Sequence, residues 1–538
     1  MWVYSADHLS TFHPDALCPV TSPTTPSRTR GQFPWARHVE SALDAVSKKR
    51  FLPVLILIVG LLPSAWLLYV VRDTPHLGLA ADDVMYIGAA QSLAREGSYR
   101  EAALPGDPWQ TKYPPGYPLM LAAILKLNLS ARNFWIIAHS WVWLSLASFA
   151  LAWAMRRAGL SPVEAALVGA LWAANPSGVD SGVSALADAP YCAVLFLTLG
   201  LVLRLDKDTI RNAALAGLVM GFACLIRSAG IVAIVGLVTW LCWRRNLRAA
   251  FCFGISASII PAIWMVWSHA HSSPAHGPVA EFYFDYVGRW LQTVRQTGLG
   301  LILKKNILFG LNSLGEWLIP FESRPLLQVF GCTILLAFGC AALAEWGGGA
   351  ITAVALATLG FQLFWNWPPN GRFFLPVAPA FLGAFVAMLS SRPWSFRIII
   401  LSVVAIADVY GVAGLEQTYA GQRDSGLSPV YAFIKTELPA NAVILGDERV
   451  WLFTGRRALE MVMPTEYWYL ERPDLEMEFF MSYKDVARQF GANYVLIGHW
   501  GKLHMDTVAV RSDPGLERVF SRNGLELFRI RTVATPSP

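Results

Sequence analysis

Residues 51–71 form an apolar run, FLPVLILIVGLLPSAWLLYVV, which is long enough to cross a lipid bilayer as one helix. Similar runs follow along the chain and predict an α-helical polytopic membrane protein with about eleven transmembrane helices. Only 15% of the 538 residues are charged, whereas soluble proteins usually carry about 25%. The predicted spans are residues 51–71, 133–155, 162–175, 190–204, 212–227, 229–243, 249–268, 326–344, 350–367, 372–390 and 396–413.

Short basic clusters between these runs predict the orientation of the chain. SKKR at 47–50, RR at 156–157, RLDKDTIR at 204–211 and WRRNLR at 243–248 all fall on one side of the predicted membrane. Because basic loops favour the cytoplasm, we expect a cytoplasmic N-terminus and, with an odd number of spans, an extracytoplasmic (periplasmic) C-terminus. The net charge of +6 is scattered over such clusters, which argues against a nucleic-acid partner and favours a multi-pass protein of the inner or plasma membrane.

The chain divides into three predicted parts. Residues 1–47 are rich in Ser, Thr and Pro and lack periodicity, so they predict a disordered cytoplasmic tail. Residues 48–414 hold the transmembrane part. Residues 415–538 alternate strand-like stretches, in 441–460 and 490–500, with helix-like ones, and predict a small extracytoplasmic α/β domain. The seven cysteines show neither a disulfide framework nor a zinc-binding spacing.

Two adjacent carboxylates, Asp82 and Asp83, follow the first span and open the stretch DDVMYIGAAQSLAREG at 82–97. Adjacent carboxylates repel each other, so one of them is expected to have a raised pKa where water is partly excluded. The same pattern is typical of the acidic N-terminus of an amphipathic helix, and this structural interpretation stays open beside a functional one.

The stretch KYPPGYPLMLA at 112–122 is more specific. Pro114 and Pro115 exclude a helix and predict an extended turn before the apolar residues re-enter the interface. Lys112, just before this turn, is placed to neutralise a phosphate, although a lysine whose ammonium only reaches toward the membrane surface would show the same pattern.

A first span, then DDxxY, then KYPPGYP before the next span resembles the GT-C integral membrane glycosyltransferases. Within them the chain resembles the protein O-mannosyltransferase and aminoarabinose transferase branch, which is glycosyltransferase family 39-like. The resemblance covers the layout of residues 50–390 and extends to the C-terminal α/β part. It implies transfer of a sugar from a polyprenyl-phosphate-linked donor to an acceptor hydroxyl on the extracytoplasmic face, with inversion at the sugar. The family usually has Asp-Glu at this motif and its first acid is catalytic, so the resemblance implies Asp82 as general base and leaves the role of Asp83 open.

The resemblance implies further site residues. Arg227 in GFACLIRSAGI and Arg372 in NGRFFLPVAPAF match arginine-containing stretches of these enzymes and, with Lys112, are expected to bind the donor phosphate. A helix-end position is the alternative explanation for Arg227. The motif tyrosines expected to line the substrate pocket are Tyr86, Tyr113 and Tyr117.

A metal is not expected. Asp180 and Asp188 are candidate metal ligands by resemblance to oligosaccharyltransferase-type relatives, but the polyprenyl-monosaccharide branch generally works without metal. His269, His271 and His276 form a loose cluster better explained by a polar loop between the seventh and eighth spans. The expected partners are the lipid-linked donor and a lipid, protein or glycan acceptor. Two other functions stay open: a lipid-linked sugar transporter or flippase, and a non-catalytic envelope scaffold.

Overall fold

The computed structural model describes residues 51–74, 76–79, 82–127, 132–205, 210–272, 278–317, 324–343, 349–424, 427–460, 469, 482–498 and 506–531. The predicted disordered tail at 1–47 and His276 lie outside these residues.

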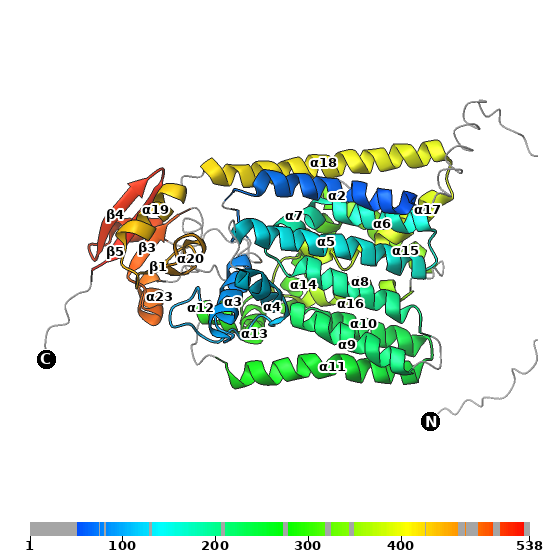
Figure 1. The fold of residues 1–538 in the computed structure, drawn as a ribbon, viewed down its shortest axis with the longest axis horizontal. Coiled ribbons are helices and arrows are strands. Elements are labelled where there is room, and N and C mark those ends of the chain that lie inside the picture. Colours follow the sequence, from blue (N-terminus) through cyan, green and yellow to red (C-terminus); the bar gives the residue numbers. More distant parts are fainter. Residues whose placement is uncertain are drawn as a thin grey trace, which may run out of the picture. The chain divides into compact units, whose positions relative to one another are not determined.

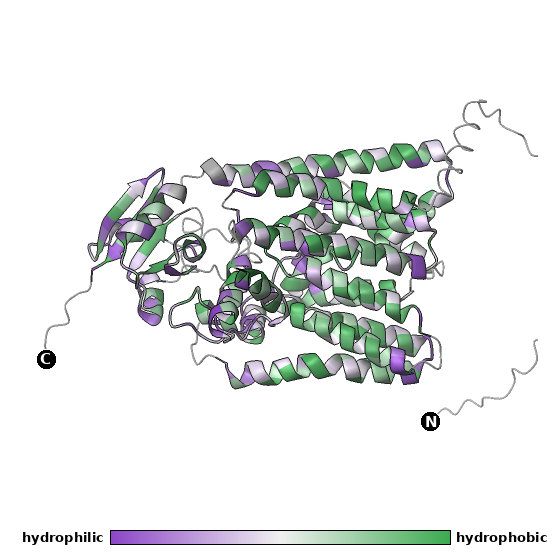
Figure 2. Ribbon diagram, viewed as in Figure 1, coloured by the Kyte–Doolittle hydropathy of each residue, from purple (hydrophilic) through white to green (hydrophobic). Residues whose placement is uncertain are grey.

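Most of the described chain is helical, and long helices run side by side (Figure 1). Figure 2 shows hydrophobic residues along these helices, hydrophilic residues near the helix ends, and a mixture of both in the C-terminal sheet. The helices are α2 (Leu52–Val71), α3 (Asp82–Glu96), α4 (Gly116–Lys126), α5 (Arg132–Arg157), α6 (Pro162–Ala174), α7 (Pro176–Val183), α8 (Asp188–Val202), α9 (Ile210–Ile226), α10 (Gly230–Trp243), α11 (Leu247–Ala270), α12 (Pro278–Phe284), α13 (Tyr286–Thr297), α14 (Leu299–Glu316), α15 (Arg324–Leu343), α16 (Gly349–Phe364), the 3-10 helix η1 (Gly371–Phe374), α17 (Ala378–Ser390) and α18 (Trp394–Asp424).

A helix lies in every predicted span, and the protein is a multi-pass membrane protein. Among the described residues, four helices are long and apolar enough to cross a membrane: α2, α5, α11 and α18. The pair α7 and α8, bent by 114°, would make a fifth span if taken together. Other apolar helices, such as α6 with 13 residues, measure only about 20 Å, less than the roughly 30 Å of bilayer hydrocarbon. Helix positions therefore agree with the predicted spans, while helix length supports fewer complete crossings.

Two segments predicted as loops contain helices. The predicted outer loop after residue 268 holds α12, α13 and α14, and the predicted loop at 175–190 holds α7. Lys304 and Lys305 interrupt the apolar run of α14, so hydropathy did not reveal it. The helix α7 forms because Pro176 occupies its first turn and the side-chain oxygen of Asn175 accepts from the backbone N–H of Ser177 at 3.1 Å.

The C-terminal α/β region, defined here as the described residues from 427 onward, contains a five-stranded sheet with strand order β2-β1-β3-β5-β4. Strands β2, β1 and β3 are parallel, and β5 and β4 continue the sheet antiparallel. Strands and helices alternate as predicted, although α20 separates two strands inside 441–460, and α18 continues past residue 414. The elements are α19 (Leu427–Glu437), β1 (Val443–Leu445), α20 (Arg449–Thr454), β2 (Arg457–Leu459), α23 (Tyr483–Phe490), β3 (Tyr494–Ile497), α25 (Thr507–Ser512), β4 (Leu516–Arg522) and β5 (Leu525–Ile530).

The short helices α3, α4, α12 and α13 lie at the end of the long helices that faces the C-terminal α/β region (Figure 1). A backbone hydrogen bond of 3.0 Å from Ala458 N–H to the Ala103 carbonyl joins this region to the loop between α3 and α4. The basic turns between α5 and α6 and between α10 and α11 lie at the opposite end. Polar connecting segments therefore gather at one end of the helices, and the candidate site is among them.

Candidate active site

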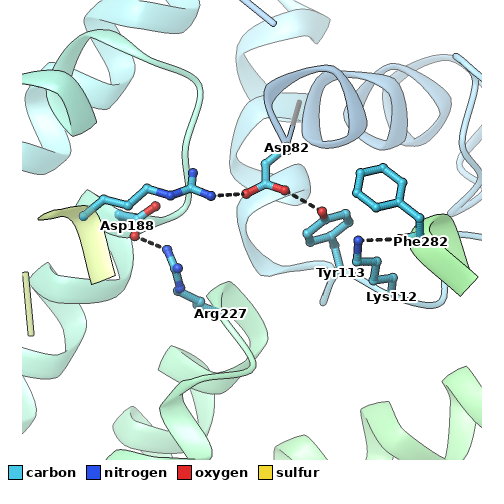
Figure 3. Close-up of polar contacts among 7 residues, drawn as sticks. Asp82, Lys112, Tyr113, Asp188, Arg227 and Phe282 are labelled. Atoms are coloured by element: carbon cyan, nitrogen blue, oxygen red, sulfur yellow. Dashed lines mark hydrogen bonds and ion pairs between the residues drawn. The ribbon is translucent and has the colours of Figure 1, made fainter. Parts of the chain in front are cut away.

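Asp82 joins three segments of the chain. It begins α3, where a carboxylate is stabilised by the free N–H groups of the first helical turn. Its carboxylate accepts from Arg372 Nη2 at 2.9 Å and from the Tyr113 hydroxyl at 2.6 Å; Figure 3 shows Asp82 facing Tyr113. The side chain of Asp82 is still 26% exposed. A carboxylate held by two donors yet open to solvent can accept a proton from an incoming group.

Asp83 has different surroundings from Asp82. It is 1% exposed, its Oδ2 accepts from the Gly78 N–H at 3.1 Å, and no described residue donates to its Oδ1. Burial, together with the charge of Asp82, raises the pKa of Asp83 to about 7. Burial also acts on Asp82, but the charges of Arg372 and Lys112 and the Tyr113 hydrogen bond hold the pKa of Asp82 below its usual range. At neutral pH Asp82 is therefore ionised, while Asp83 is close to its midpoint.

Lys112 lies in a non-helical bend just before α4, whose N-cap is Pro115; the prolines correctly predicted a turn here. It is buried, and its ammonium donates to the Phe282 carbonyl at 2.5 Å (Figure 3). The ammonium also lies 4.4 Å from the ring centroid of Phe282 and 4.9 Å from those of Tyr113 and Tyr286. Burial lowers the pKa of Lys112 to about 7, against the opposing effect of the Asp82 charge. An anion bound beside it would favour the charged form.

The two arginines converge on Phe373. Arg227, directly after α9, forms an ion pair with Asp188 at the start of α8 (Figure 3). Arg372 lies in η1, and the guanidinium carbons of Arg227 and Arg372 are 5.3 and 5.2 Å from the centroid of the Phe373 ring. The Nη1 of Arg372 is buried, and no described residue accepts from it. This guanidinium therefore retains a donor for a ligand.

The three motif tyrosines form one buried group. The Tyr86 ring centroid lies 4.9 Å from that of Tyr113 and 5.1 Å from that of Tyr117. Tyr113 reaches Asp82, whereas Tyr117 is fully buried and pairs with the Ser140 hydroxyl at 3.3 Å. Only Tyr113 of the three thus touches the carboxylate directly, and the other two pack behind it.

Phe282, Tyr286 and Phe373 were not predicted as site residues. Phe373 adjoins Arg372 in a stretch that was singled out, so its position offered a signal. Phe282 and Tyr286 lie in the mixed-polarity segment after α11, where no motif marked them. Their contact with Lys112 depends on the fold.

The acidic residues considered as metal ligands have other partners. Asp180 accepts from the Tyr419 hydroxyl and, at 3.3 Å, from the Ser184 hydroxyl, and Asp188 pairs with Arg227. His271 stacks on Trp267 with ring centroids 4.4 Å apart. Within the part of the chain that the structure describes, no three His, Cys, Asp or Glu residues group so that they could hold a metal ion.

Comparison with solved structures identifies the fold class of this chain. No protein-family model and no curated protein matches the sequence. The structure is similar to ArnT from Cupriavidus metallidurans bound to undecaprenyl phosphate, with a TM-score of 0.57 and 15% identity, covering 90% of this chain and 99% of that one. It is also similar to the oligosaccharyltransferase from Archaeoglobus fulgidus, with a TM-score of 0.50 and 11% identity, covering 83% of this chain and 69% of that one. Both are membrane glycosyltransferases with the GT-C fold, so this chain has a GT-C-like fold, as predicted.

Proposed function

We propose that the protein is a membrane glycosyltransferase that moves a sugar from a polyprenyl-phosphate-linked donor to an acceptor hydroxyl, with Asp82 as general base. The observation that carries this proposal is the contact between Asp82 and Arg372, beside Lys112 and Tyr113. The ionised carboxylate of Asp82 lies beside basic side chains in a small polar region within a GT-C-like fold.

In the proposed reaction, Asp82 accepts the proton of the acceptor hydroxyl as its oxygen attacks the anomeric carbon of the donor sugar. The bond between that carbon and the phosphate oxygen breaks, its electron pair stays on the phosphate, and the polyprenyl phosphate leaves. A positioned base contributes about 10²–10⁴-fold to such a step. A single displacement of this kind inverts the anomeric centre.

Negative charge grows on the phosphate during this step, and the cations are assigned to stabilise it. Arg372 contributes its buried Nη1, and Arg227 and Lys112 complete the proposed phosphate-binding group. Charge stabilisation is strongest where water is excluded, because the surrounding dielectric is low. In this assignment Arg372 touches the base through Nη2 and the leaving phosphate through Nη1.

The proposed topology has eleven spans, a cytoplasmic N-terminus and an extracytoplasmic site. The separation of the basic turns from the candidate site, at opposite helix ends, supports this orientation. A site at the membrane boundary suits a donor whose prenyl chain stays in the bilayer while its sugar reaches the aqueous side.

The test compares a deletion strain complemented with the wild-type gene, with Asp82→Asn, or with Asp73→Asn as the matched control. Asp73 lies nine positions earlier, and its side chain is 74% exposed. Mass spectrometry of envelope glycans and glycolipids should show one sugar modification that the deletion and Asp82→Asn both lack and that Asp73→Asn restores. Full restoration by Asp82→Asn would contradict the assignment of the base. If, in addition, purified Asp82→Asn protein carried lipid-linked sugar across liposomes, a transporter would replace the enzyme.

A further inference from the structure

We propose that Glu448, in the C-terminal α/β region, is a positioning residue for Lys112 and that this region thereby completes the active site. The inference rests on the proposed function, because it concerns the binding of the same donor phosphate. It follows a chain of contacts from the Lys112 ammonium through α12 to the sheet.

The first contact places Lys112 on α12. A lysine side chain is flexible, so the position of its ammonium is determined by the groups that it touches. The ammonium of Lys112 donates to the Phe282 carbonyl and lies against the Phe282 ring, both of which belong to α12, and against the ring of Tyr286 in α13. A shift of α12 would therefore move the ammonium.

The second contact fastens α12 to the sheet. Tyr283 follows Phe282 and is 1% exposed; its hydroxyl donates to Glu448 Oε2 at 3.1 Å and accepts from the Glu460 N–H at 2.9 Å. Glu448 follows β1 and Glu460 follows β2, two neighbouring parallel strands. The carboxyl ends of parallel strands are where open α/β sheets usually build their sites. Here the residues that follow β1 and β2 both form hydrogen bonds with Tyr283 of α12.

The turn 446–449, which contains Glu448, also contacts the segment before Asp82 and Asp83. Arg449 is 1% exposed and pairs with Asp447 at 3.0 Å. Its aliphatic stem lies so close to Gly78 that a Cβ atom there would overlap it. The N–H of Gly78 is the donor to Asp83. The turn 446–449 therefore touches the segment before α3 as well as α12.

The protonation state of the Glu448 carboxyl determines which substitution should preserve its contact with Tyr283. Its side chain is 3% exposed, and no described residue donates to its Oε1. Burial and the neighbouring charge of Glu460 raise the pKa of Glu448 well above its usual range, which favours the protonated carboxyl. Glutamine has the shape and charge of a protonated glutamate and can accept from Tyr283. Alanine removes the group that accepts from the Tyr283 hydroxyl, so this hydroxyl keeps only the hydrogen bond from the Glu460 N–H.

The experiment titrates undecaprenyl phosphate onto the purified full-length protein in nanodiscs and follows tryptophan fluorescence. Glu448→Ala and Tyr283→Phe should each weaken binding roughly 5- to 20-fold, because a displaced Lys112 ammonium loses part of its contact with the phosphate. Glu448→Gln should stay within about 2-fold of wild type. Glu517→Ala, which removes an exposed carboxylate of the same region, is the matched control and should bind like wild type. Elution volume and melting temperature identify variants that do not fold, and Tyr283→Phe keeps the test decisive if Glu448→Ala is one of them.

The deciding measurement repeats Glu448→Ala in a Lys112→Ala background. If Glu448 acts through Lys112, the second substitution adds no further loss, whereas a general structural defect would weaken binding equally in both backgrounds. Equal losses, or wild-type affinity of both Glu448→Ala and Tyr283→Phe, would overturn the inference while leaving the proposed function intact. A folded wild-type protein that does not bind undecaprenyl phosphate would overturn both.

Discussion

Arg372 donates to the Asp82 carboxylate at 2.9 Å across 290 positions of the sequence, and its Nη1 remains buried without an acceptor among the described residues. One guanidinium thus holds the proposed base in its ionised form and presents a donor to a ligand. Arginine can do both because its planar group carries several N–H donors in a rigid arrangement.

Arg372→Gln should shift the acid limb of the pH–activity profile to higher pH. Without the neighbouring positive charge, which opposes the effect of burial, the pKa of Asp82 rises. Since the base works only when ionised, activity would then be lost at a higher pH than in wild type. Activity measured in membranes between about pH 4 and 8 checks this. Arg72→Gln, at an exposed ion pair with Asp73, is the control and should leave the acid limb in place.

Asp83→Asn should stabilise the protein at high pH and leave Asp82, the proposed base, in place. The folded-state pKa of Asp83 is about 7, above its ordinary 3.8, so stability present below about pH 4 is lost as the pH rises through 7. Asparagine cannot ionise and can still accept from Gly78. We expect a gain on the order of a few kcal/mol at about pH 8.5 and little change near pH 4.5, read from melting curves at both values. A loss of activity as large as that of Asp82→Asn would instead make Asp83 the base.

Binding of undecaprenyl phosphate should weaken as the pH rises above about 7. The pKa of Lys112 is lowered to about 7 by burial, so the ammonium loses its proton there unless a bound phosphate retains it. Lys112→Arg keeps its charge and should remove this alkaline decline, while Lys112→Met should weaken binding about 10- to 100-fold at pH 6. Affinities measured at several pH values test this. A decline that persists in Lys112→Met would assign it to another group.

Accessibility labelling tests the proposed orientation. In a variant without native cysteines, Asp73→Cys lies on the side of the candidate site, and Arg244→Cys lies in the exposed basic turn after α10. A membrane-impermeant maleimide added to spheroplasts should label position 73 at once and position 244 only after the membrane is opened. The reverse pattern would place the candidate site in the cytoplasm and exclude the proposed outer-face reaction.

Gly200→Ala should destabilise the helix bundle, because a Cβ at Gly200 in α8 would overlap the ring of Trp153 in α5. Overpacking of this kind costs about 1–3 kcal/mol. Gly360→Ala in α16 is the matched control: no described atom lies within 4 Å of its Cβ position, and alanine favours the helix by up to about 1 kcal/mol. Melting temperatures in detergent should therefore fall for the first variant and stay level or rise for the second.

Sequence patterns predicted the helical segments because the bilayer imposes a local requirement. A segment inside hydrocarbon must be apolar and must satisfy its own backbone hydrogen bonds. Both requirements involve residues that are consecutive in the sequence, so the sequence pattern shows them directly. The end of α6 was predicted, because the third predicted span stops at residue 175, but α7 was missed because its Ser, Gly and Asp residues are typical of a loop. The amphipathic helices α13 and α14 were missed because their charged residues resemble those of a loop.

The sequence by itself determined the membrane class of the protein and its two local motifs, in which Asp82 and Lys112 are only 30 positions apart. Tertiary structure alone decided that Arg372 meets Asp82, that Phe282 receives the Lys112 ammonium, and that Glu448 reaches α12. The physical reason is distance along the chain. A motif consists of residues that are close together in the sequence, so it can be found without the fold. Contacts between remote segments depend instead on how whole helices and a sheet pack together.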